Sequence, residues 1–200
     1  MNHFKEAAKT WDQGPTINRN KVFAESIEKH LQRGNLSLLD FGCGTGLLSQ
    51  FLESKISNLV GIDPTLEMLD QFKSKFTHLN SVRSFALNIE TESLPKDIGR
   101  FDVVVSAMAF HHLDQPLKAL GILKGLLNPE GQIFVIDLDQ EDGSFHPDNK
   151  GMGVKHFGFS ADEQKMWSSE LGFKSFTREI IHHISKNERE YGVALSLYQI

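Results

Sequence analysis

The stretch that decides the fold is Leu-Leu-Asp-Phe-Gly-Cys-Gly-Thr-Gly-Leu-Leu, residues 38–48. The apolar run Leu36–Phe41 is typical of a buried strand, and Leu47–Ser54 has the pattern of a helix. Glycines at alternate positions form the turn between them, where they permit a tight bend and let a ligand approach the backbone closely. A strand, a glycine turn and a helix in this order are typical of the first unit of a doubly wound, nucleoside-binding sheet.

The rest of the chain alternates short apolar runs with segments of helical period. Helices are expected around residues 4–11, 23–31, 64–76 and 114–127, the last capped by Asp114 and followed by a turn at Asn128–Gly131. Further strands are predicted at Asn58–Ile62, Ser81–Leu87, Phe101–Ser106 and Gln132–Leu138. Strands that alternate with helices favour a parallel sheet covered on both faces.

After Asp139 the pattern changes. Residues 139–159 are polar and rich in Gly and His, and Ser160–Glu163 is a capping box that opens one more helix. Two strands then follow, Lys174–Ser185 and Glu190–Ile200, joined by a tight polar turn. We therefore expect an α/β fold, a Rossmann-like, doubly wound and mostly parallel seven-stranded sheet with an antiparallel C-terminal hairpin. It forms a single domain over 1–200, with an N-terminal helical lid segment at 1–34 and an active-site loop at 139–159.

Composition excludes several classes of function. The 200 residues carry a net charge of -5, whereas nucleic-acid-binding proteins usually have an excess of basic residues. The single cysteine, Cys43, excludes an intramolecular disulfide and a metal site of clustered thiolates. No apolar stretch is long enough to span a bilayer. We expect a cytoplasmic protein with no nucleic-acid or membrane partner, and no feature of the sequence indicates an oligomeric state.

Two acidic residues constrain the ligand of the glycine turn. Asp63 ends the second strand at the distance from the glycines where an acid binds the two ribose hydroxyls of a nucleoside, although it could also cap the following helix. A dinucleotide fingerprint would need a third glycine where Leu47 stands, and Asp40 would repel a pyrophosphate. A carboxylate beside the turn suits a positively charged ligand that carries an amino group, a sulfonium or both.

At this point the sequence resembles a known family, the class I S-adenosylmethionine-dependent methyltransferases, and among them the small-molecule type 11/12 group. The likeness is close over about residues 38–138. It rests on five motifs in order, namely Leu39–Gly46, Gly61–Leu69, Asn88–Pro95, Phe101–Ser106 with Ala109–Leu113, and Leu126–Gly131.

The resemblance implies S-adenosylmethionine as cofactor, S-adenosylhomocysteine as product, and a role for each matching residue. The backbone of Gly42, Cys43 and Gly44 would lie against the methionine part, which Asp40 would face. Asp63 would accept hydrogen bonds from both ribose hydroxyls. The remaining contacts would come from Pro64 and Met68 on the adenine or ribose, Asn88 and Ile89 on the adenine, Ser106 at the methionine part, and Trp11 as a lid over the site.

Some of these residues have simpler alternatives. Met68 could belong to the core, Trp11 could anchor its helix, and Asn88 could be a turn residue. The family commonly has Asp where this chain has Asn88, so we expect the adenine contact to be kept through the amide oxygen without the charge.

The chemistry requires the acceptor atom to lie about 3 Å from the methyl group in a site with little water. Catalytic candidates are His111 and His112, which follow the fourth strand. One of them is expected to face the site, although a helix-start or packing role is an equal alternative. His146 and His156 lie in the long loop. No histidines stand at ligand spacing, so we expect no metal.

The function indicated is methyl transfer to a small-molecule acceptor by in-line displacement. After Ser106 comes Ala107-Met108-Ala109, not the motif linked to amino-group methylation of bases, so small-molecule O-, N-, S- or C-methylation remains. The alternatives are an S-adenosylmethionine-binding protein without catalysis and a nucleotide-linked oxidoreductase.

Overall fold

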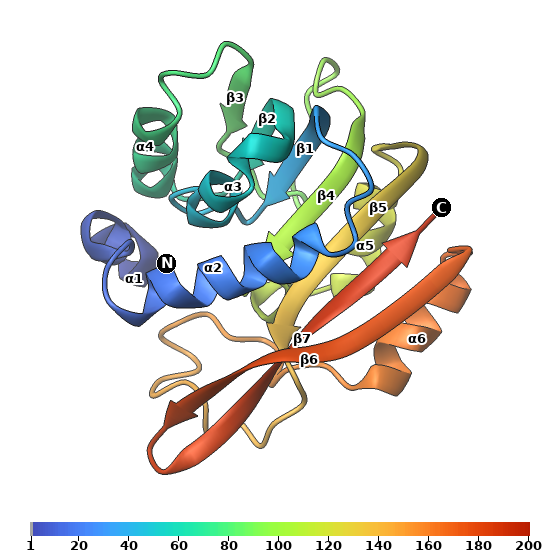
Figure 1. Cartoon of the computed structure of the whole chain (residues 1–200). Coiled ribbons are helices and arrows are strands. Elements are labelled where there is room, and N and C mark those ends of the chain that lie inside the picture. Colours follow the sequence, from blue (N-terminus) through green and yellow to red (C-terminus); the bar gives the residue numbers. More distant parts are fainter. Residues whose placement is uncertain (1) are drawn as a thin grey trace.

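The structure is a computed structural model that describes residues 2–200, with side chains from residue 4 onward. Figure 1 shows the arrangement of its helices and strands. In chain order the elements are α1 (Asn2–Ala7), η1 (Ala8–Thr10), α2 (Pro15–Glu28), β1 (Leu36–Phe41), α3 (Leu47–Phe51), η2 (Glu53–Lys55), β2 (Ile56–Ile62), α4 (Leu66–Lys75), β3 (Val82–Phe85), β4 (Phe101–Ala107), η3 (Phe110–His112), α5 (Pro116–Lys124), β5 (Leu127–Leu138), α6 (Ala161–Glu170), β6 (Ser175–Lys186) and β7 (Arg189–Gln199).

The strands form one seven-stranded sheet in the order β3-β2-β1-β4-β5-β7-β6. Strands β1 to β5 pair in parallel, and β7 pairs antiparallel with both β5 and β6. The chain moves outward from β1 to β3 and then returns to β4 on the other side of β1. The predicted doubly wound sheet with an antiparallel C-terminal hairpin is confirmed.

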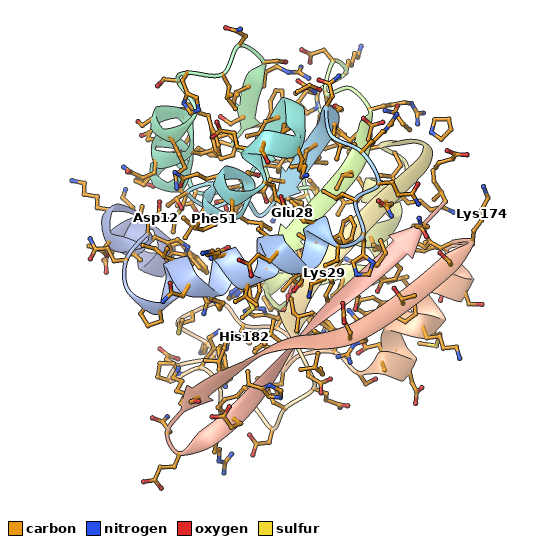
Figure 2. All side chains as sticks on the ribbon, in the orientation of Figure 1. Asp12, Glu28, Lys29, Phe51, Lys174 and His182 are labelled. Atoms are coloured by element: carbon orange, nitrogen blue, oxygen red, sulfur yellow. The ribbon has the colours of Figure 1, made fainter. Side chains whose placement is uncertain are left out.

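The two faces of the sheet carry separate hydrophobic cores. Along β1, Leu36 and Leu38 pack with residues of α2, α3 and α4, whereas Leu39 and Phe41 pack with residues of α5 and α6. Figure 1 shows α2 crossing the face opposite α5. On this face Phe23 of α2 meets His182 of β6 edge to face, with ring centroids 6.2 Å apart, and Figure 2 marks His182 below α2. Strands buried on both faces have continuous apolar sequences, and this is why the apolar runs predict the central strands.

The glycine turn has a steric reason for its composition. Gly42 (φ 68°) and Gly46 (φ 77°) have left-handed backbones, which side chains disfavour. A Cβ on Gly42 would come within 2.4 Å of the Cβ of Ala109, and one on Gly46 within 2.6 Å of the Phe72 ring. The turn is tied to the neighbouring strand by the N–H of Gly42, which donates to the carbonyl of Ile62 over 2.8 Å.

Several predicted boundaries differ from the observed ones. Helix α2 runs over Pro15–Glu28, whereas the sequence predicted a helix over residues 23–31. Strand β5 begins at Leu127 and includes the predicted turn, where Glu130 has a φ of 65° and the pairing with β4 shifts register. Asp114 does not cap α5. It pairs with Lys155, and the Glu90 carboxylate accepts the N–H of Gln115 over 2.6 Å instead.

The C-terminal elements follow their sequence signals. Ser160 caps α6 by accepting the N–H of Glu163 over 3.2 Å, as the capping box predicted. The hairpin turn at Asn187 and Glu188 has φ values of 52° and 59°, the conformation that the tight two-residue turn between twisted strands requires. Among the described residues, no helix is long and apolar enough to cross a membrane.

Candidate active site

A cavity lies at the carboxyl ends of β1, β2 and β4, where such sheets bind ligands. Most residues that the sequence assigned to the cofactor line it. They are Asp40, Gly42, Cys43, Gly44, Asp63, Pro64, Met68, Asn88, Ile89 and Trp11, and they are joined by His112. The fold therefore gathers into one concave site residues that span 102 positions of the chain, from Trp11 to His112.

Two predicted residues lie outside this lining. Ser106 is buried in β4 and alternates in direction with Ala107, which does line the cavity together with Met108 and Ala109. Met108 has a left-handed φ of 55°, and this turn brings Ala109 against Gly42. His111 is buried behind His112. Ser106 is thus not among the cavity-lining residues, whereas the three residues that follow it are.

Asp40 is a buried carboxylate at the end of β1. Ser49 of α3 donates to its Oδ2 over 2.7 Å. Burial raises the pKa of Asp40 to about 7, against the lowering effect of the Ser49 hydrogen bond. A buried carboxylate with one hydroxyl partner is strongly stabilised by a cation at the same place.

Asp63, at the end of β2, accepts two backbone hydrogen bonds. The N–H of Gly44 donates to Oδ2 over 3.0 Å, and the N–H of Thr65 donates to Oδ1 over 2.8 Å. Burial raises the pKa of Asp63, and the two backbone hydrogen bonds oppose that rise. Asp63 can therefore hold the start of α4 through Thr65 and still bind a ligand, because each of its carboxylate oxygens can accept a further hydrogen bond.

The part of the cavity beyond β3 is formed by Asn88, Ile89 and Met68. The amide oxygen of Asn88 accepts the N–H of Glu90 over 2.9 Å, so Asn88 is a turn residue that also faces the cavity. Ile89 and Met68 are buried, with 4% and 2% of their surface exposed. An apolar wall beside an amide oxygen suits a flat ring with an amino group.

The N-terminal segment is pinned over the glycine turn. Asp12 accepts the hydroxyl of Thr45 over 2.5 Å and pairs with Lys75 at the end of α4 over 2.5 Å. Figure 2 shows Asp12 on the side of α1 next to α4. Trp11 and Phe4 line the cavity, with their ring centroids 5.8 Å apart. Trp11 thus lies at the cavity wall, in a segment that Asp12 ties to Thr45 and Lys75.

A histidine–aspartate pair lies next to the cavity. The Nδ1 of His111 lies 2.6 Å from the Oδ1 of Asp137 in β5, and both side chains are almost fully buried. Burial alone would raise the pKa of Asp137, but the charge of His111 and its hydrogen bonds outweigh burial and lower it. His112 lies at the cavity wall, where its ring meets the Phe4 ring edge to face at 5.2 Å. Of the two adjacent histidines, His112 is the one that faces the site.

Sequence reasoning missed two functional candidates. Arg19 of α2 is the only lysine or arginine among the described residues that line the cavity, and its Nε is buried without a hydrogen-bond partner in that part of the chain. Burial lowers the pKa of Arg19. The second candidate is Asp137, which lies in the predicted strand Gln132–Leu138. A charged residue inside the run Ile133–Leu138 was the signal that could have revealed it, since unpaired charges are rarely buried.

The loop over residues 139–159 is irregular but held at many points. Glu141 accepts the N–H groups of Gly143, Ser144 and Phe145 through one oxygen, and Lys186 donates to the carbonyl of Phe145 over 2.6 Å. The carbonyl of His111 accepts the N–H of Lys155 over 2.9 Å. These contacts hold the loop beside His111 and His112.

The sequence of this chain is similar to those of known methyltransferases. A family described as a methyltransferase domain matches residues 39–135. An uncharacterised methyltransferase of Schizosaccharomyces pombe is 34% identical over 145 residues, which cover 66% of this chain and 51% of that protein. A tRNA U34 carboxymethyltransferase of Pseudomonas fluorescens is 26% identical over 180 residues, which cover 86% of this chain and 56% of that protein. The chain thus spans little more than half the length of these curated relatives.

The fold has a close counterpart among solved structures. The N-methyltransferase NodS of Bradyrhizobium japonicum, solved with S-adenosylhomocysteine, aligns with a TM-score of 0.73 and 16% identity, covering 99% of this chain and 96% of NodS. At this identity the likeness concerns the fold. Taken with the sequence relatives, the domain match places residues 39–135 of this chain in the methyltransferase domain family.

Proposed function

We propose that this chain binds S-adenosylmethionine in the cavity and transfers its methyl group to a small-molecule acceptor. The observation that carries the proposal is the pair of buried carboxylates, Asp40 and Asp63, on either side of a glycine turn. Such a site repels phosphate and attracts a nucleoside that carries positive charge and a ribose.

The charged groups of the cavity suit the two ends of an amino acid. Asp40 would face the ammonium and sulfonium charges, and Arg19 would face the carboxylate. A ligand carboxylate would give the buried Nε of Arg19 the acceptor that the described residues do not provide. Asp63 would take the ribose hydroxyls through its remaining acceptor positions, and Asn88 and Ile89 would meet the adenine.

The cofactor, when bound, supplies a methyl group already activated for in-line displacement. The protein has to orient the acceptor and exclude water. Phe4 and Trp11 cover the cavity, and Asp12 fixes their segment to Thr45 and Lys75. His112 is the polar side chain we assign to the acceptor, and Asp137 orients His111 behind it.

We also propose the division of the single domain: residues 1–34 form a lid, and residues 139–159 form an active-site loop.

The charge of the protein favours a small-molecule acceptor over a nucleic acid. The chain has a net charge of -5, and among the described residues that line the cavity Arg19 is the only lysine or arginine. Relatives named tRNA U34 carboxymethyltransferases make an RNA acceptor the alternative.

The experiment is transfer of labelled methyl from S-adenosylmethionine to a cell extract separated into small molecules, RNA and protein. We expect label in the small-molecule fraction, and much less of it with the Asp63→Ala variant at a limiting concentration of S-adenosylmethionine. Label confined to RNA would overturn the acceptor class. Absence of label in every fraction, with cofactor binding intact, would favour a binding protein without catalysis.

A further inference from the structure

Three histidines from two distant parts of the chain meet beside the cavity. Each of His111, His112 and His146 offers one ring nitrogen, and these three nitrogens lie within 4.8 Å of one another. The ring centroids are 4.1 Å apart for His111 and His112, 5.1 Å for His111 and His146, and 6.0 Å for His112 and His146. Three imidazoles around one tetrahedral ion would have centroids about 5 Å apart at ordinary metal–nitrogen distances. The cluster therefore has the size of a three-histidine metal site.

The groups around the cluster orient it as the outer shell of a metal site does. Asp137 lies against the Nδ1 of His111 at 2.6 Å, which leaves Nε2 for another partner. This Nε2 is buried and has no hydrogen-bond partner among the described residues, and the same holds for the Nδ1 of His146. The Nδ1 of His112 lies 3.2 Å from the carbonyl of Gly153. A carboxylate or carbonyl on one ring nitrogen fixes the tautomer whose other nitrogen binds metal.

We propose that His111, His112 and His146 form a binding site for a divalent transition-metal ion, zinc above all. Imidazole nitrogen suits zinc, copper and nickel, whereas magnesium and calcium need oxygen ligands. Three histidines leave a fourth position of the tetrahedron for a water molecule or a substrate. Sequence spacing did not reveal the site, because 33 residues separate His112 from His146 in the chain.

The position of the cluster links it to the acceptor. His112 is also a cavity-lining residue, so the open position of the ion would lie at the edge of the methyl-transfer site. This part of the inference rests on the proposed function. A thiol or hydroxyl acceptor that coordinates there would release its proton to solvent, and its lone pair would form the new bond to the methyl carbon as the carbon–sulfur bond of the cofactor breaks.

The test is a zinc titration of the untagged, metal-stripped full chain, with S-adenosylhomocysteine binding measured on the same samples. We expect one equivalent of zinc per chain. Substitution of Asp137→Asn should weaken binding about 10- to 100-fold, as loss of an outer-shell carboxylate does, and His111→Gln or His146→Gln should weaken it more. The matched control is His156→Gln, a histidine of the same loop outside the cluster, which should leave the affinity unchanged.

The outcomes separate this inference from the proposed function. Failure of the wild-type chain to bind stoichiometric zinc while it still binds S-adenosylhomocysteine would overturn the metal site alone. Equal zinc affinity of the wild type and His146→Gln would also overturn it. Cobalt in place of zinc adds a spectroscopic check, because a tetrahedral three-histidine site should give visible absorption that His146→Gln abolishes and His156→Gln keeps.

Discussion

The carboxylate of Asp63 accepts a hydrogen bond from the backbone N–H of Gly44, 3.0 Å away. The acid at the end of β2 and the glycine turn after β1 therefore hold each other in place before any ligand is present. The same carboxylate that we assign to the ribose is also part of the wall against which the rest of the nucleoside would lie.

Replacing Asp63 with alanine should weaken binding of S-adenosylhomocysteine by one to a few kcal/mol, about tenfold to several hundredfold, because a buried charged hydrogen-bond partner is lost. Calorimetric titration measures the change. The matched control is Asp102→Ala, an acid near the other end of the sheet that accepts the N–H of Ser37 over 3.0 Å. If both variants bind the ligand equally well, Asp63 does not hold the ribose.

Affinity for S-adenosylhomocysteine should depend on pH through Asp40. Because the pKa of Asp40 in the free protein is about 7, its carboxyl group is largely protonated below that pH and must lose its proton to face a cation. Affinity should therefore fall as pH falls below about 7, at most about tenfold per unit. Titrations between pH 5.5 and about 8 test this. Asp40→Asn should bind weakly at every pH, and Ser49→Ala should move the transition upward.

Stability of the ligand-free protein should have the opposite dependence on this group. The folded-state pKa of Asp40 is raised above the unfolded value of 3.8, so between these two values the folded state holds a proton that the unfolded chain has lost. The contribution of Asp40 to stability is thus present at low pH and is lost as pH rises toward about 7. Denaturant unfolding of the wild type and Asp40→Asn should reveal this difference. A stability difference between them that stays constant across this pH range would contradict the assignment.

The N-terminal segment should govern how fast the ligand leaves. Asp12→Asn removes the ion pair with Lys75, which is partly buried, so the segment should open more often and ligand dissociation should accelerate about threefold to tenfold. Stopped-flow fluorescence of Trp11 measures the rate, with Trp11→Phe identifying its signal against Trp167. A control is Lys5→Ala, which removes an exposed pair with Glu67. Unchanged dissociation in Asp12→Asn would mean that the segment is no lid.

Two glycines of the turn should respond differently to a methyl group. Gly42→Ala would place its Cβ 2.4 Å from the Cβ of Ala109, so we expect a loss of about 2–4 kcal/mol in unfolding free energy. In Gly44→Ala the new Cβ meets only the sulfur of Met68, at 3.9 Å. The unfolding free energy should therefore fall by about 1–2 kcal/mol, the cost of a left-handed backbone for a residue with a side chain. Ligand binding should also weaken. Urea unfolding compares the two. Equal losses of unfolding free energy in the two variants would mean that the turn moves to relieve the clash between residue 42 and Ala109.

The sequence predicted the sheet and most of the cavity because both depend on local pattern. Strands buried on both faces read as apolar runs, and Asp40, the glycines and Asp63 stand at strand ends. Ser106 does not line the cavity but Ala107 does, because side chains alternate in direction along a strand and a pattern of apolar residues does not show which of two neighbours faces the ligand side. Arg19 could not be assigned, because it lies before residue 23, where the predicted helix begins, and its place at the cavity depends on how α2 packs on the sheet.

Contacts across long loops could not be predicted at all. The segment that leads into α5 is held by Glu90, which accepts the N–H groups of Asp114 and Gln115, and the predicted cap by Asp114 does not form. The meeting of His146 with His111 and His112 depends on the course of the 139–159 loop, which has no periodic pattern. These are the places where tertiary structure decides the outcome.

The most direct test of the account is a calorimetric titration of the full chain with S-adenosylhomocysteine and, separately, with NAD. Two buried carboxylates beside a glycine turn predict submicromolar to micromolar binding of S-adenosylhomocysteine, weakened by Asp63→Ala, and no heat with NAD. Binding of NAD without binding of S-adenosylhomocysteine would contradict the account.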